Sequence, residues 1–205
     1  HIQAFKLAEE LSLPVMVCMD GFILTHAYER VDMPTQDQVD AFLPPYEPRQ
    51  VLDPADPVSI GAMVGPEAFA EVRYLEHEKQ MRALELIPRI ADEFKAGFGR
   101  DSGGLVRGYR LDDAETVIVA MGSLLGTIKD TVDEMRAAGV KIGVLGVISF
   151  RPFPLAEVRA ALKGAKRVVV VEKTFAVGIG GILATDIRTA MDGISILDYT
   201  VVAGL

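Results

Sequence analysis

Residues 141–154 read KIGVLGVISFRPFP, an apolar run that leads into an arginine between an aromatic residue and a proline. Runs of this length that are rich in Val and Ile are typical of buried β-strands. Pro152 and Pro154 end the strand-like pattern, and a helical pattern starts at Leu155. The stretch therefore predicts a strand, a fixed turn and a helix in succession.

Three further runs share this character, and helical patterns lie between the runs. The strand-like runs are TVIVAM (116–121), RVVVVE (167–172) and SILDYTVV (195–202), and the helical stretches are 124–138, 155–163 and 182–191. Short strands that alternate with helices are typical of a mostly parallel sheet with helices on both faces. The last hundred residues therefore predict a compact α/β domain.

The N-terminal part has a different pattern. Residues 1–14 have helical spacing without a cap, so we expect the chain to begin inside a longer protein. The run PVMVCM predicts a strand over Val15–Met19, in another sheet, with Cys18 buried as a small apolar side chain. Asp20 and Gly21 would then lie at the carboxyl end of that strand, where parallel sheets face ligands.

A helix cap and several prolines indicate how the residues that follow are organised. Thr35 has the position of an N-cap for a short helix through Leu43, and residues 44–66 are a proline-dense arm. A long helical pattern follows from Glu67, and Pro88 is expected either to kink it or to begin a second helix.

Composition excludes several classes of protein. Twenty-one basic and twenty-nine acidic residues give a formal net charge of −8, which disfavours nucleic acid and anionic membranes as partners. A single cysteine excludes a disulfide within the chain and a cysteine-based metal site. The sequence contains no apolar run long enough to span a membrane, so a cytoplasmic protein is expected.

Two glycine-rich junctions are weak candidates for a phosphate site. In MGSLLGT (121–127), Gly122, Ser123 and Gly126 surround the start of a helix, whose backbone N–H groups can bind an anion. Neither this stretch nor AVGIGGIL (176–183) completes a known phosphate motif. The alternative is structural, with Gly122 turning the chain, Ser123 capping the helix and the other glycines allowing close packing.

Four polar residues are candidates for an interface. His26, in DGFILTHAY with Asp20 and Thr25, has either a part in proton transfer or a structural hydrogen bond. Arg151 either clamps an anion or belongs to the turn described above. We predict no catalytic residue and no metal ligand, because the residues form neither a nucleophile–base pair nor a metal-ligand spacing.

Several strings are together similar to one family. They are DGFILTHAYERVDMP, FLPPY, FGR, the block from Tyr109 to Pro154, and VVVVEKTFAVGIGG. In collinear order over nearly the whole chain, they resemble the alpha subunit of 2-oxoacid:ferredoxin oxidoreductases of the pyruvate synthase type. The most specific parts are DGF followed by TH, and the block from MGS to RPFP. The chain would be a C-terminal portion of such a subunit.

The resemblance implies a domain organisation. Residues 1–43 would be the C-terminal part of a domain that binds the pyrimidine of thiamine diphosphate, and 44–108 a linker arm with a long helix. Residues 109–205 would be an α/β domain like the C-terminal domain of transketolase, in which RPFP is a family signature.

The resemblance also implies a reaction, in which a 2-oxoacid, coenzyme A and oxidised ferredoxin give an acyl-CoA, carbon dioxide and reduced ferredoxin. Pyruvate is the favoured substrate, with 2-oxoglutarate, branched-chain and aromatic oxoacids as alternatives. Thiamine diphosphate, Mg²⁺ and iron–sulfur clusters would act in a complete complex with beta, gamma and delta-type subunits. This chain alone would bind none of them and would serve assembly, as part of an oligomer.

Two other interpretations remain at this stage. One is a non-catalytic α/β interaction domain, and the other is a nucleotide-binding module built on MGSLLGT.

Overall fold

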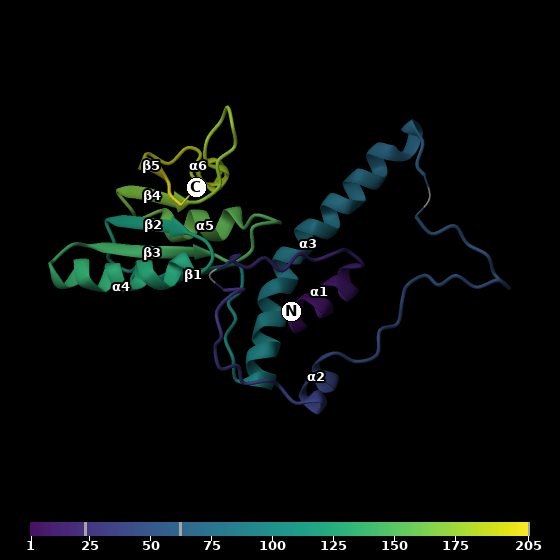
Figure 1. The fold of residues 1–205 in the computed structure, drawn as a ribbon. Coiled ribbons are helices and arrows are strands. Elements are labelled where there is room, and N and C mark those ends of the chain that lie inside the picture. Colours follow the sequence, from purple (N-terminus) through teal and green to yellow (C-terminus); the bar gives the residue numbers. More distant parts are fainter. Residues whose placement is uncertain (23, 62, 205) are drawn as a thin grey trace. The chain divides into compact units, whose positions relative to one another are not determined.

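The computed structural model describes residues 1–22, 24–61 and 63–204, which form two compact units (Figure 1). One consists of His1–Cys18 and Glu29–Ser102, and we call it the helical unit. The other consists of Met19–Tyr28 and Gly103–Leu205, and we call it the sheet unit. The short segment Met19–Tyr28 thus belongs to the sheet unit although helical-unit sequence flanks it on both sides.

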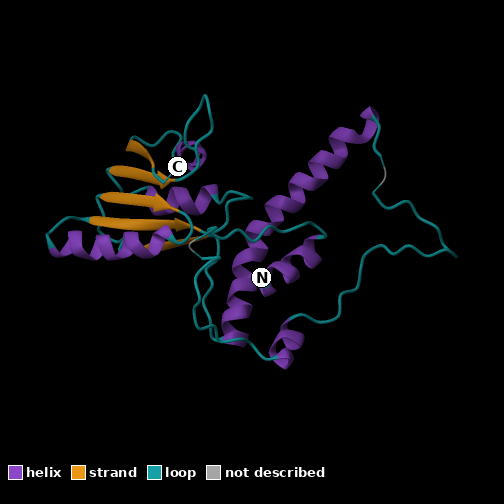
Figure 2. Cartoon of the chain, viewed as in Figure 1, coloured by secondary structure: helices purple, strands orange, loops and turns teal. Residues whose placement is uncertain are grey.

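The sheet unit contains a five-stranded sheet in the order β1-β3-β2-β4-β5 (Figure 2). Its strands are β1 (Val106–Tyr109), β2 (Thr116–Ala120), β3 (Ile142–Val147), β4 (Arg167–Glu172) and β5 (Leu197–Val202). β1 pairs antiparallel with β3, and the other pairs are parallel. The predicted mostly parallel sheet is confirmed, and β1 is an addition that the apolar runs did not predict.

Helices cover both faces of this sheet, as predicted (Figure 1). α4 (Leu124–Ala137) packs Ile128 and Val132 against one face, while α5 (Leu155–Leu162) and α6 (Ile182–Ala190) bury their apolar sides on the other. The chain runs from β2 through α4 to β3 on one face and from β3 through α5 to β4 on the other. The carboxyl ends of β2 and β4 therefore flank the switch point, where open α/β sheets usually hold ligands.

The helical unit contains α1 (Ile2–Leu11), α2 (Gln36–Phe42) and α3 (Pro66–Phe98). Thr35 caps α2 as predicted, and its side chain and that of Gln38 form a reciprocal capping box. α3 continues through Pro88, so the alternative that a second helix begins there is wrong. Leu86 and Ile90 on either side of Pro88 are buried in the core of this unit, which holds the helix together despite the missing N–H.

Two predictions for residues 14–19 are wrong. Val15–Met19 forms no strand, and its side chains are exposed, Met16 by 85%. Cys18 is exposed as well. A strand is stable only with a hydrogen-bonded neighbour, and none of the described residues pairs with this segment.

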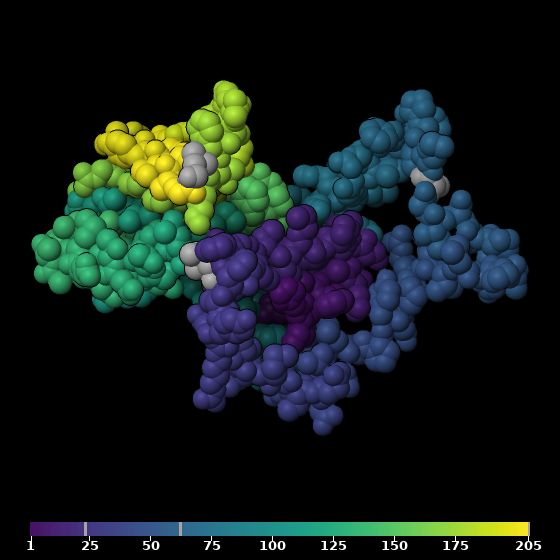
Figure 3. Space-filling model, in the orientation of Figure 1, coloured from purple at the N-terminus to yellow at the C-terminus, as the bar shows by residue number. Residues whose placement is uncertain are grey.

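Residues 44–61 contain neither helix nor strand, and all of their side chains are exposed. Figure 3 shows them as a narrow chain of atoms in blue. Among the residues that the structure describes, no helix is both long and apolar enough to cross a membrane.

Candidate functional site

The candidate site lies at the carboxyl edge of the sheet, where β2 leads into α4. Gly122 turns the chain with a φ of +73°, a conformation that side-chain-bearing residues rarely adopt. Ser123 takes the N-cap position of α4, but its side chain makes no capping hydrogen bond, so the predicted cap by Ser123 is wrong. The start of α4 is instead capped by a residue from far away in the sequence.

Asp20 provides that cap. Its Oδ2 accepts a hydrogen bond of 2.7 Å from the Ser123 backbone N–H, across 103 residues of sequence. Hydrogen bonds from the side chain and the backbone of Ser123 hold the pKa of the Asp20 carboxyl below its usual range, and the charge of Lys173 contributes less. The candidate phosphate position at Ser123 is therefore already engaged by an anion of the chain itself.

The predicted site residues come together only in part. Asp20, Gly122 and Ser123 meet at the carboxyl edge of the sheet. Gly126 lies in the first turn of α4, and a side chain there would meet no other atom within 4 Å. These glycines and Ser123 remain candidates for binding that the geometry supports weakly, because the N–H of Ser123 is occupied.

Thr25 and His26 form a small turn within the Asp20 segment. The Phe22 N–H donates to Thr25 Oγ1 (2.9 Å), and this oxygen lies 3.1 Å from His26 Nδ1. The rings of Phe22 and His26 stack with centroids 4.7 Å apart. No carboxylate is bonded to His26 among the described residues, so the turn has the form of a presented surface and not of a catalytic relay.

Glu172 has a structural role in the sheet unit that the sequence did not predict. It ends β4 and is 6% exposed, and it accepts hydrogen bonds from the backbone N–H groups of Leu183 (2.9 Å) and Ala184 (3.0 Å). A Cβ on Gly181 would overlap Glu172 Oε1. The signal was a single glutamate that ends an apolar run and precedes a glycine-rich helix start, which is the pattern of a distant N-cap.

Arg151 is held by internal partners. Its two terminal nitrogens lie 2.9 and 3.3 Å from the Asp186 carboxylate oxygens. Its guanidinium lies 4.2 Å from the centroid of the Phe150 ring, and it also donates to the Phe150 carbonyl (2.7 Å). The side chain is 52% exposed, which leaves part of the guanidinium accessible to another molecule.

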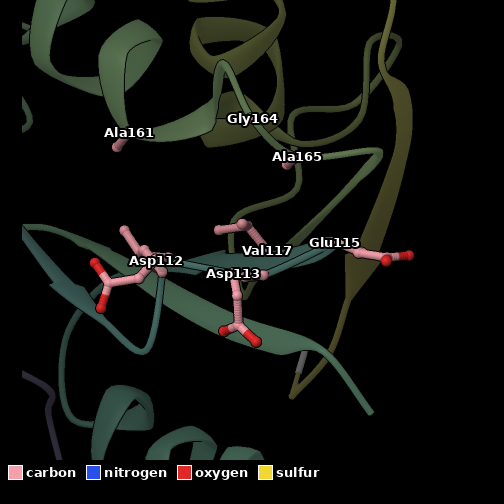
Figure 4. Close-up of a pocket in the computed structure, with 9 residues that line it drawn as sticks. Asp112, Asp113, Glu115, Val117, Ala161, Gly164 and Ala165 are labelled. Atoms are coloured by element: carbon pink, nitrogen blue, oxygen red, sulfur yellow. The ribbon is translucent and has the colours of Figure 1, made fainter.

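A small cavity of about 180 Å³ lies at the opposite, amino end of the strands (Figure 4). Asp112, Asp113 and Glu115 line it together with backbone and small side chains after α5. Hydrogen bonds from Arg136 and from Lys166 lower the pKa of the Asp113 and Glu115 carboxyls, respectively. The carboxylates of Asp113 and Glu115 are thus engaged in ion pairs, and the described residues contain no group of three potential metal ligands.

A wider hollow of about 480 Å³ lies within the helical unit, along α2 and α3. Lys6 crosses it, forming an ion pair of 2.7 Å with Glu93 and lying 4.4 Å from the centroid of the Phe42 ring. Phe42 also packs on Phe94 and Phe98. Lys6 and Glu93 are thus paired with each other, and the hollow lies among the helices of one packed unit.

Comparison with known proteins gives two family models that match consecutive parts of the chain. Residues 1–92 match the model described as the thiamine diphosphate-binding region of pyruvate flavodoxin/ferredoxin oxidoreductase. Residues 114–205 match core domain II of pyruvate:ferredoxin oxidoreductase. The two models belong to one type of enzyme and occur here in collinear order.

Curated relatives agree with these models. The chain is 47% identical to pyruvate synthase subunit PorA of Methanosarcina barkeri over 97% of its own length and 51% of the relative's. It is 41% identical to PorA of Methanocaldococcus jannaschii over 99% and 54%, and 37% identical to ketoisovalerate oxidoreductase subunit VorA of Pyrococcus horikoshii over 93% and 48%. The chain spans about half the length of these relatives.

A solved structure shares the fold. The 2-oxoglutarate:ferredoxin oxidoreductase of Magnetococcus marinus, solved with 2-oxoglutarate, coenzyme A and succinyl-CoA bound, aligns with a TM-score of 0.52 at 18% identity. The alignment covers 83% of this chain and 27% of that one. With both family models and these relatives in agreement, the chain belongs to the 2-oxoacid:ferredoxin oxidoreductase family.

Proposed function

We propose that this chain forms part of the alpha subunit of a thiamine-diphosphate-dependent 2-oxoacid:ferredoxin oxidoreductase in the cytoplasm. The complex would convert a 2-oxoacid, coenzyme A and oxidised ferredoxin to an acyl-CoA, carbon dioxide and reduced ferredoxin. The observation that carries the proposal is the 47% identity to a pyruvate synthase subunit over 97% of the chain. On this proposal, residues 1–43, 44–108 and 109–205 correspond to the pyrimidine-domain tail, the linking arm and the transketolase-like domain.

The part played by this chain is assembly and architecture. At the carboxyl edge of the sheet, Asp20 caps α4, Glu172 caps α6, and Arg151 pairs with Asp186. Each of these three charged groups is bonded to an internal partner, so none of them is placed to exchange a proton with a substrate. Together with Thr25 and His26, Asp20 and Arg151 would instead contact another domain or subunit.

The described residues do not provide a complete cofactor site. A diphosphate needs donors and Mg²⁺ ligands, but the Ser123 N–H is bonded to Asp20, and no three potential metal ligands gather among the described residues. One cysteine cannot supply the roughly four thiolates of an iron–sulfur cluster. We therefore propose that thiamine diphosphate, Mg²⁺ and the clusters are bound in the complete complex with residues outside this chain, including those of the beta, gamma and delta-type subunits.

Pyruvate is the proposed substrate. The pyruvate synthase subunits among the relatives are 39–47% identical to this chain, whereas the ketoisovalerate oxidoreductase subunits are 37–38% identical. A branched-chain 2-oxoacid is therefore the second candidate. The relative rates of the complex with pyruvate and with 2-oxoisovalerate separate the two candidates.

We expect activity from the complex and none from the isolated chain. The protein is affinity-tagged in its native host, and the eluted complex is assayed for pyruvate- and CoA-dependent reduction of a viologen dye. Pyruvate should give the highest kcat/KM, ahead of 2-oxoisovalerate and 2-oxoglutarate. Elution of the chain without partner subunits would refute the proposal and favour a non-catalytic interaction domain. Heat of binding on titration with a nucleotide would favour the nucleotide-binding module.

Arg151→Ala tests the contact role. Because the Arg151–Asp186 pair is half-exposed, its removal should lower the free energy of unfolding by no more than about 1 kcal/mol. Recovery of partner subunits with the tagged chain should fall severalfold. The matched control is Arg188→Ala, because Arg188 is equally exposed and pairs with Asp198 in the same unit. Intact assembly with abolished turnover in Arg151→Ala would instead assign Arg151 to the chemistry.

A further inference from the structure

We propose that the Asp20 carboxylate holds the segment Met19–Tyr28 on the sheet unit by accepting a hydrogen bond at the N-terminus of α4. We call this contact the clasp. The segment is short, is flanked on both sides by helical-unit sequence, and nevertheless belongs to the sheet unit. Its carboxylate meets the Ser123 N–H at the switch point of the sheet, the position at which this fold usually holds a ligand. The chain thus fills its own anion position.

Gly122 lets the Asp20 carboxylate come close to the backbone at the start of α4. A Cβ on Gly122 would lie 3.0 Å from Asp20 Oδ2, which is closer than ordinary packing allows, and the φ of +73° already favours glycine there. Gly122 therefore serves both the turn after β2 and the seat of Asp20. Gly139, by contrast, has a φ of +87° with no atom near its Cβ position, so its conformation serves the turn alone.

The other hydrogen bonds that the described residues of the segment make lie within the segment. Between described residues they run from Phe22 to Thr25, from Thr25 to His26, and from the His26 N–H to the Phe22 carbonyl. These bonds stiffen the turn internally. Among the described polar groups, Asp20 therefore supplies the hydrogen bond between this segment and the rest of the sheet unit, and the turn that follows it carries exposed Phe22 and His26.

Electrostatics favours the ionised carboxylate. The positive end of the α4 dipole and the charge of Lys173, which follows β4, both attract it, and the first turn of α4 carries no acidic side chain. The folded pKa of Asp20 is lowered, so the clasp is closed at neutral pH. It opens only as the pH falls through that lowered folded value, below the ordinary range of an aspartate.

Amide hydrogen exchange of the 205-residue chain with Asp20→Ala, which removes the acceptor of the Ser123 N–H, tests the proposal. The backbone amide of Ser123, and those of Phe22 and His26, whose hydrogen bonds lie in the segment that Asp20 holds, should exchange about tenfold faster or more, because the acceptor of the Ser123 N–H is lost. Exchange in β2, β3 and β4 should be unchanged. Asp32→Ala is the matched control, because the exposed Asp32 side chain pairs only with the nearby Arg30 among the described residues.

Equal exchange in the parent and in Asp20→Ala would overturn the clasp, and so would faster exchange throughout the sheet unit, because Asp20 would then support the whole fold. If Asp20→Ala does not fold, Gly122→Ala replaces it, since its methyl group would lie 3.0 Å from Asp20 Oδ2 and crowd the carboxylate while it stays in the chain. Gly139→Ala controls for backbone strain at positive φ. Faster exchange of the Ser123, Phe22 and His26 amides in Gly122→Ala but not in Gly139→Ala would support the clasp, and equal exchange in both variants would refute it.

Discussion

Gly143→Ala is expected to lower the free energy of unfolding by about 3 kcal/mol, among the largest losses for the addition of one methyl group. Gly143 is buried in β3 opposite Val117 of β2. A Cβ there would overlap the carbonyl oxygen of Arg110 and lie 3.0 Å from Leu111 Cδ2. The connection between β1 and β2 therefore crosses β3 at Gly143, through the space that the Cβ atom of any other residue would occupy.

The obstructing carbonyl cannot move aside cheaply. Arg110 has a φ of +57°, and its carbonyl accepts a hydrogen bond of 2.8 Å from Arg136 of α4. Arg136 is itself bonded to the Ile142 carbonyl (2.6 Å), immediately before Gly143. Relief of the overlap would break this bridge between α4, β3 and the crossing loop.

The measurement is thermal and urea unfolding followed by far-UV circular dichroism, because the chain has no tryptophan for fluorescence. For a unit of this size, a loss of 3 kcal/mol lowers Tm by about 10–20 °C. Gly164→Ala is the control, since no atom lies within 4 Å of its Cβ position, and it should change stability by less than about 0.5 kcal/mol. Equal stability of the two variants would show that the Arg110 carbonyl yields.

The sheet was predictable from sequence where its strands carry their own signal. β2, β3 and β4 are runs of Val and Ile that must be buried on both faces, and the helices between them show helical spacing. β1 was missed because VRGY has neither alternation nor an apolar run. Its place is set by pairing with β3, which is a tertiary interaction.

The candidate site shows the same division. Gly122 and Ser123 were identified because a strand–helix junction is a local pattern, but the partner of Ser123 lies 103 residues away and has no local trace. Asp20 was placed at the end of an expected Val15–Met19 strand that does not form. Apolar composition alone did not decide that segment, because a strand needs a neighbour to accept its hydrogen bonds.

Glu172→Ala is also expected to lower the free energy of unfolding by about 3 kcal/mol. It removes buried atoms, whereas Gly143→Ala adds one where there is no room. The substitution leaves the backbone N–H groups of Leu183 and Ala184 buried without a partner and opens a cavity between β4 and α6. Glu172→Gln keeps the volume and one acceptor oxygen, so it should lose about half as much.

Glu134→Ala is the matched control, because Glu134 is an exposed glutamate on α4, and its change should stay within about 0.5 kcal/mol. Unfolding by urea with far-UV circular dichroism compares the three variants with the parent. If Glu172→Gln were as destabilising as Glu172→Ala, the negative charge and not the acceptor geometry would cap α6. If neither differed from Glu134→Ala, the N-terminus of α6 would find another partner. The glycine at 181, which leaves room for the carboxylate, would then have no role that the structure explains.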